Sequence, residues 1–111
     1  MAATNDPERA AQAFTVAASA LASGCEISLW LTSEASQFAL PGFAEKFELA
    51  HSAPLNELRD AILSAGTITL CTQCAVRRNI LQSDLISGIL IKGSASFVEE
   101  IMHDGVQALI Y

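Results

Sequence analysis

Hydrophobic positions in the first third of the chain recur with two different periods, and these predict a helix followed by a strand. Within Pro7–Ala22 they recur every three or four residues, which is the spacing of one helix face. Asp6 can cap the first free amide groups of this helix, and proline suits its first position. Within residues 25–32 they recur at every second residue, which is typical of a strand. This assignment places Cys25 in the core.

The same two periods predict further helices and strands in the rest of the chain. The helices cover residues 33–38, 54–64, 72–78 and 94–103, and the strands cover residues 67–70, 88–91 and 106–111. In the last helix, Val98 and Met102 are expected to face inward. Strands that alternate with helices imply a mostly parallel sheet with helices on both faces and right-handed crossovers.

The whole chain, residues 1–111, is predicted to be a single domain, because its length suits one hydrophobic core. Folds of this kind usually open with a hydrophobic strand. Only residues 1–4 are available before the first helix. The first strand is therefore expected to be very short or truncated.

Composition and charge narrow the classes of partner. Hydrophobic residues make up 51% of the chain, charged residues 16%, and the net charge is −6. An acidic chain with scattered basic residues is not expected to bind nucleic acid. No apolar run is long enough to span a bilayer, and Asp6 and Glu8 come too early for a secretion signal. We therefore expect a cytoplasmic protein that does not bind membranes.

The most specific chemical feature is the pair Cys71 and Cys74, three residues apart between a predicted strand and a predicted helix. Amide groups at a helix start favour an anion, and the thiolate is the reactive form of cysteine. Zinc is not expected, because His51 and His103 match no ligand spacing. The residues leave three alternatives open, namely sulfur transfer, dithiol redox chemistry, and two small buried side chains without a function. We predict no metal and no cofactor.

Four further residues are predicted to bind a substrate or acceptor. Arg77 and Arg78 can hold a thiolate or an anionic acceptor by charge and by forked hydrogen bonds. Sites in open α/β sheets gather at the carboxyl ends of the strands. This edge would bring Asn5, in the turn after the first strand, and residues 32–34, after the next strand, near Thr72, which follows the first thiol.

The order of these motifs resembles the DsrE/DsrF-like sulfur-relay family, with its TusD-type and YchN-like members. The resemblance runs through D-P-E-R-A-A-Q-A-F, then C-x-x-C-x-x-x-R-N-I, then D-L-I-S-G. In that family a cysteine is followed six and seven residues later by two arginines, as Cys71 is by Arg77 and Arg78. Cys74 matches the second cysteine of the members that have C-x-x-C. Asn79 stands where the family has glycine, and asparagine tolerates the left-handed turn that we predict there.

The resemblance implies a three-layer α/β/α sandwich with flavodoxin-related winding and a mostly parallel sheet of about five strands. It also implies a homo-oligomer, a trimer or a hexamer, which exchanges sulfur with a donor or acceptor protein. Our leading hypothesis is a sulfur carrier or sulfurtransferase that holds sulfane sulfur as a persulfide on Cys71, with Cys74 able to resolve it. The alternatives are an oligomeric scaffold or small-molecule-binding module without catalysis, and a dithiol redox protein that uses Cys71 and Cys74.

Overall fold

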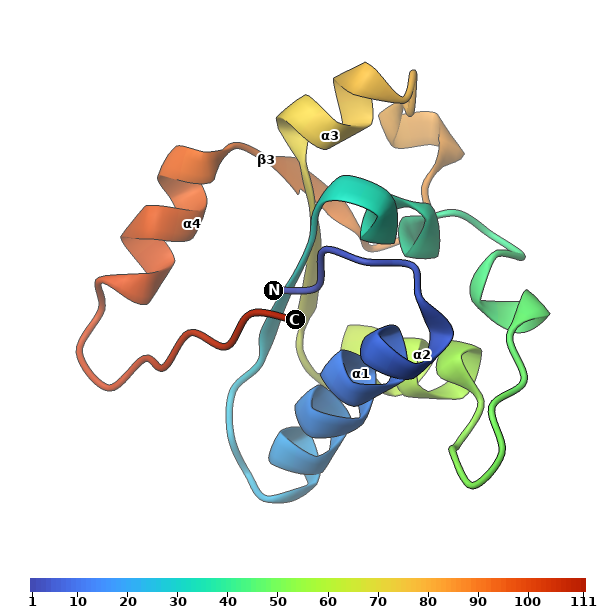
Figure 1. The fold of residues 1–111 in the computed structure, drawn as a ribbon. Coiled ribbons are helices and arrows are strands. Elements are labelled where there is room, and N and C mark those ends of the chain that lie inside the picture. Colours follow the sequence, from blue (N-terminus) through green and yellow to red (C-terminus); the bar gives the residue numbers. More distant parts are fainter.

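A parallel sheet of three strands, in the order β1-β2-β3, lies at the centre of the computed structural model, which describes residues 1–111 (Figure 1). Helices and strands alternate, as their hydrophobic periods predict. The main elements are α1 (Pro7–Ala22), β1 (Ser28–Leu31), α2 (Leu55–Ala65), β2 (Thr67–Cys71), α3 (Thr72–Arg77), β3 (Leu90–Lys92) and α4 (Ser94–Ile101). Short 3-10 helices cover η1 (Ser33–Ala39), η2 (Ala44–Lys46) and η3 (Gln82–Asp84).

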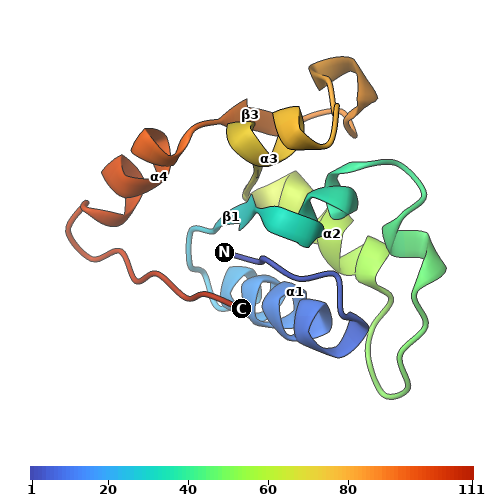
Figure 2. The same ribbon diagram turned by 45° about the horizontal axis from the view of Figure 1, so that its top comes forward.

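One face of the sheet is closely packed. Helices α1 and α2 lie side by side on it (Figures 1 and 2). Alternate strand residues such as Leu31 and Leu70 are fully buried there, in one cluster with Phe14 of α1 and Ile62 of α2. Burial of large apolar side chains is the main favourable term in folding, so this face supplies most of the stability.

The opposite face of the sheet is covered only in part, by α4. The ring of Phe97 meets the buried ring of Trp30 edge to face, with centroids 5.4 Å apart. The Glu100 carboxylate accepts hydrogen bonds from the Trp30 indole at 2.9 Å and from the Ser28 hydroxyl at 2.8 Å. No residue of α4 is itself buried, and Figure 1 shows this helix standing apart from α1 and α2. None of the helices has both the length and the apolar character needed to cross a membrane.

The two ends of the chain lie next to each other at the β1 edge of the sheet (Figures 1 and 2). Ala2 forms a single parallel bridge with Leu31. The Tyr111 amide donates to the Met1 carbonyl at 2.9 Å, and the Ala3 amide donates to the Tyr111 carbonyl at 3.0 Å. The short first strand is thus one bridge. The prediction of about five strands is wrong, because residues 106–111 find only the first three residues to pair with and form no strand.

Two predictions of burial are also wrong. Strand β1 begins at Ser28, and Cys25 is exposed, because its amide still donates to Ala20 at the end of α1. Val98 and Met102 are 52% and 75% exposed, since α4 leans on the sheet mainly through Phe97 and Glu100.

Candidate functional site

Cys71 lies at the carboxyl end of β2, where the chain turns into α3. Its backbone is still extended, and it is the residue that caps the helix. The Cys71 side chain is half-buried. It lies at the carboxyl edge of the sheet, where the sequence predicts the site. No capping hydrogen bond reaches the Cys71 side chain, so the predicted support from the α3 amides is not seen.

Cys74 lies one helical turn further on and is buried, with 7% of its surface exposed. Its Sγ accepts a hydrogen bond from the backbone N–H of Ser33, at a distance of 3.1 Å. Ser33 follows β1 and opens η1, whereas Cys74 follows β2. The carboxyl ends of two neighbouring parallel strands therefore build the site together.

The amide of Ser33 is held in place by an unusual turn. Ser33 has a φ of 47°, in the left-handed region that residues other than glycine seldom adopt. The fully buried Ser36 donates its hydroxyl hydrogen to the Ser33 carbonyl at 2.6 Å. The sequence predicts a short helix capped by Ser33, but the cap position is Thr32 and Ser33 is the first residue of η1. The sequence gives Ser36 no role. The only signal is a serine three residues before another serine, directly after a strand.

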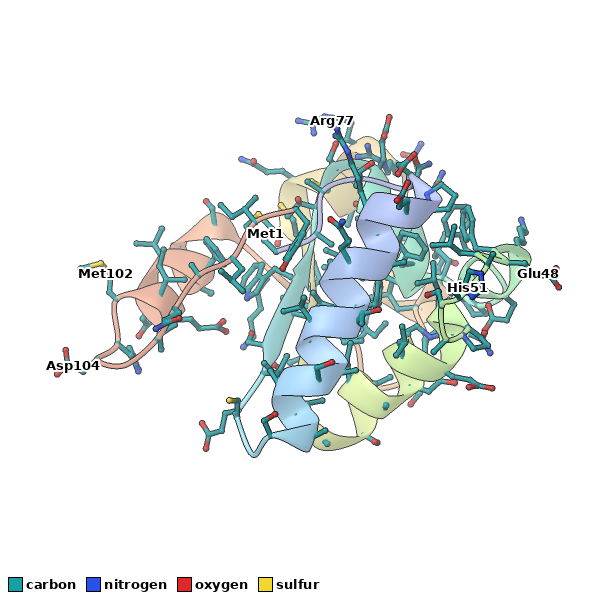
Figure 3. All side chains as sticks on the ribbon, turned by 60° about the horizontal axis from the view of Figure 1, so that its bottom comes forward. Met1, Glu48, His51, Arg77, Met102 and Asp104 are labelled. Atoms are coloured by element: carbon teal, nitrogen blue, oxygen red, sulfur yellow. The ribbon has the colours of Figure 1, made fainter.

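The predicted binding residues fall into two groups. Arg78 is half-buried, and its guanidinium donates to the Cys74 carbonyl at 3.4 Å, so it contacts the backbone of the second cysteine. Arg77 and Thr72 are exposed and make no side-chain hydrogen bond, and Arg77 points outward at the edge of the molecule (Figure 3). Asn5 donates to the Gln37 side chain at 3.2 Å, so its contact is with η1 and not with a thiol.

Three of the six basic residues of the chain lie near the two ends of α3. Lys92 on β3 pairs in register with Cys71, which the sequence did not reveal because the two residues are distant along the chain. Arg77 is the last residue of α3 and Arg78 caps its end, so both lie at the opposite end of this helix from Cys71.

The turn after α3 confirms one prediction and fixes the position of the helix. Asn79 has a φ of 52°, the left-handed conformation predicted for it. The amide of Ile80 donates back to the Ala75 carbonyl at 2.9 Å, and both residues are buried. Helix α3 is therefore anchored at its far end, although it has only six residues.

The surroundings of the site limit the chemistry. No three His, Cys, Asp or Glu side chains lie close enough together to hold a metal ion. A cavity of about 1060 Å³ lies between β1, α4 and the C-terminal segment, and a smaller one of about 440 Å³ lies beside α1. Neither cavity is lined by Cys71 or Cys74. Neither of these two cavities therefore offers the thiols a binding pocket.

The chain is similar to known proteins in its sequence and in its fold. The model of the DsrE/DsrF-like family matches residues 1–109. The fold is similar to the crystal structure of the ychN protein from E. coli, with a TM-score of 0.75 and 18% sequence identity. That match covers 98% of this chain and 92% of the E. coli chain. No curated protein sequence matches the chain.

Proposed function

Because the chain belongs to the DsrE/DsrF-like family, we propose that it is a sulfur carrier or sulfurtransferase that holds sulfane sulfur as a persulfide on Cys71. The family supports a role of the sulfur-relay type. The observation that carries the assignment to Cys71 is the position of its half-buried thiol at the carboxyl end of β2, one helical turn before a second thiol. Cys25 is more exposed, but it lies in the loop before β1, at the end of the sheet opposite to Cys71.

The proposed reaction needs only thiol chemistry. The Cys71 thiolate attacks the sulfane sulfur of a donor, a new S–S bond forms, and the rest of the donor leaves with the electron pair of the broken bond. With thiosulfate the leaving group is sulfite. An acceptor thiolate then attacks the outer sulfur, and Cys71 leaves as a thiolate. In this proposal the neighbouring basic residues Arg78 and Lys92 stabilise the anions by charge.

A dithiol redox function is the second candidate, because Cys74 lies within the same helical turn as Cys71. This function would interconvert the free thiols of the structure and a Cys71–Cys74 disulfide. It predicts a reversible disulfide under mild oxidants and no stable sulfur adduct. The scaffold alternative predicts that Cys71 reacts no faster than a free model thiol.

The proposal includes self-association. Apolar side chains of α4 and the C-terminal segment are exposed, among them Met102 at 75% and Ile110 at 69%. Figure 3 shows Met102 at the outer end of α4, far from the packed helices. Exposed apolar side chains gathered in one region are typical of contact surfaces between subunits. A homo-oligomer, a trimer or a hexamer, would cover this region with further copies.

The experiment that tests the proposed function follows one sulfur atom through loading and discharge. The protein is incubated with thiosulfate or with a low-molecular-weight persulfide, freed of donor, and its intact mass is measured. We expect a gain of one sulfur atom that is lost again on adding an acceptor thiol. The Cys71→Ser variant should gain none, whereas the matched Cys25→Ser variant should behave as the wild type. Equal loading of the two variants would contradict the proposal.

A further inference from the structure

The hydrogen bond from Ser33 to Cys74 changes the relative stability of two redox states. The sulfur of Cys74 is buried and has the Ser33 amide as its donor at 3.1 Å. A thiol or thiolate sulfur accepts such a bond better than a disulfide sulfur does, and contacts that favour the reduced form make a dithiol pair more oxidising. The contact therefore stabilises the reduced state of Cys74.

The donor is held from both sides, so it cannot easily follow the sulfur if Cys74 moves. The amide of Thr32, just before it, donates to the Ala2 carbonyl at 2.9 Å. The carbonyl of Ser33, just after it, accepts from the buried Ser36 hydroxyl. A fixed donor contributes more to one state over the other than a mobile one, because no ordering cost is incurred when the bond forms.

We infer that the turn from Ser33 to Ser36 keeps Cys74 reduced and so makes the site retain sulfur on Cys71 instead of releasing it as sulfide. This inference rests on the proposed function of Cys71. Under this inference both serines are positioning residues. Ser33 acts through its backbone amide and Ser36 through its hydroxyl. Their role is to direct the sulfur toward an external acceptor thiol.

The step that this turn opposes can be written in full. The Cys74 thiolate attacks Sγ of the Cys71 persulfide, a Cys71–Cys74 disulfide forms, and the bond to the outer sulfur breaks. The outer sulfur leaves as hydrosulfide with both electrons of that bond, so it is reduced while Cys74 is oxidised. No other oxidant or reductant takes part. Because Cys74 must give up its bond from Ser33 as it becomes a disulfide sulfur, the contact lowers the driving force of this release.

The first test measures the thiol–disulfide equilibrium of Cys71 and Cys74 in glutathione buffers. Free thiols are trapped by alkylation, and the intact mass of the protein is measured by mass spectrometry. Ser36→Ala removes the hydrogen bond that holds the turn and is expected to shift the equilibrium about three- to fivefold toward the disulfide. Ser64→Ala is the matched control, since the Ser64 hydroxyl also donates to the carbonyl three residues earlier, at 3.0 Å, but far from the thiols. This control should leave the equilibrium unchanged.

Two variants at Ser33 separate the amide from the side chain. Replacing Ser33 by its α-hydroxy acid counterpart puts an ester oxygen in place of the N–H, and we expect the same shift, at least as large. Ser33→Gly keeps the N–H and tolerates the positive φ, so it should leave the equilibrium nearly unchanged. If the ester variant does not favour the disulfide, the inference is overturned, whatever the folding of Ser36→Ala.

The second test measures sulfide released by protein loaded with sulfur. Ser36→Ala should release more hydrosulfide for each persulfide than the wild type, and adding Cys74→Ser to it should abolish the increase. An increase that persists without Cys74 would contradict the inference. If no persulfide forms on any variant, the proposed function fails, but the equilibrium measurement still decides whether the turn stabilises reduced Cys74.

Discussion

Two aromatic pairs of nearly the same geometry lie on opposite faces of the sheet in very different surroundings. Phe14 and Phe38 meet at 5.3 Å on the side of α1 and α2, and Trp30 and Phe97 meet at 5.4 Å under α4, both edge to face. Phe14 and Phe38 are fully buried, whereas Phe97 is half-buried on a helix with no buried residue. The same contact thus belongs to a core on one face and to a loosely covered surface on the other.

This difference indicates that different parts of the chain provide its stability and its proposed function. The packed face fixes the strands, and the strands fix the positions of Ser33, Cys71 and Cys74 at their carboxyl ends. On the α4 face, apolar surface remains exposed, and we propose that copies of the chain meet there. The predictions below test this division, from the largest expected effect to the smallest.

Truncation of one ring on each face should give very unequal losses of stability. We expect Phe14→Ala to lower the free energy of unfolding by about 3–5 kcal/mol, since it empties a filled core site. Phe97→Ala should cost no more than about 1.5 kcal/mol, close to the value of an aromatic pair. Urea denaturation of both variants checks this. Equal losses would mean that the two faces are packed alike.

A charge placed among the exposed apolar residues after α4 should break the assembly without unfolding the chain. We expect Ile110→Asp or Met102→Asp to weaken self-association at least about tenfold, because a charge would have to be buried between subunits. Val76 on α3 is 70% exposed, so Val76→Asp is a control of matched exposure. Light scattering over a range of concentrations gives the masses. If the Val76 control dissociates and the Ile110 and Met102 variants do not, the contact surface lies elsewhere.

Loosening α4 alone should leave the core intact. In Glu100→Gln the charged acceptor of the Trp30 and Ser28 hydrogen bonds is lost, which should cost about 1 kcal/mol. Trp30 is the only tryptophan, so its emission should shift to the red and become more open to quenching. The exposed neighbour Glu99 makes no hydrogen bond through its side chain, and Glu99→Gln should change neither property. An unshifted spectrum in Glu100→Gln would show that α4 docks without this carboxylate.

The smallest effect is expected at the ion pair of the packed face. The Arg59 guanidinium donates to the Glu45 carboxylate at 2.7 Å, and this holds the pKa of Glu45 below its ordinary value. Folding therefore disfavours protonation of Glu45, so its contribution is present above the ordinary pKa and is lost as the pH falls through the lowered one. Since Glu45 is partly exposed, the contribution is at most about 0.5 kcal/mol.

Comparing the unfolding of wild type and Glu45→Gln at neutral and at acidic pH checks this contribution. The difference between the two proteins should vanish on acidification. A difference that stays constant with pH would contradict an origin in the charge of Glu45.

Much of the fold followed from the sequence because local periodicity decides it. The helix beginning after Asp6, the strand ending at Cys71 and the left-handed Asn79 all depend on neighbouring residues and were predicted correctly. The strand predicted at residues 106–111 was not, because its pairing with the first three residues depends on distant parts of the chain. Cys25 was wrongly placed in the core because the alternating apolar pattern already begins at Cys25, before β1 starts at Ser28.

The sequence predicted the part of the site that is continuous in the chain, and it placed residues 32–34 at the same edge of the sheet as Cys71. Cys71, Cys74 and Arg78 lie within eight residues, so their proximity follows from the sequence. Ser33 follows β1 and Lys92 ends β3, and only strand order and register bring them beside Cys74 and Cys71 respectively. A backbone amide carries no signature in the residue type, so this donor was beyond prediction from composition or spacing.

The most direct test of the central claim asks which cysteine takes up the sulfur atom. Cys25 is exposed, Cys71 half-buried and Cys74 buried, so accessibility alone would favour Cys25. After brief incubation with a persulfide donor, the protein is alkylated and digested, and the extra sulfur is located among the three cysteines by mass spectrometry. Our account predicts that it lies mainly on Cys71. Sulfur that appears mainly on Cys25, in proportion to exposure, would contradict it.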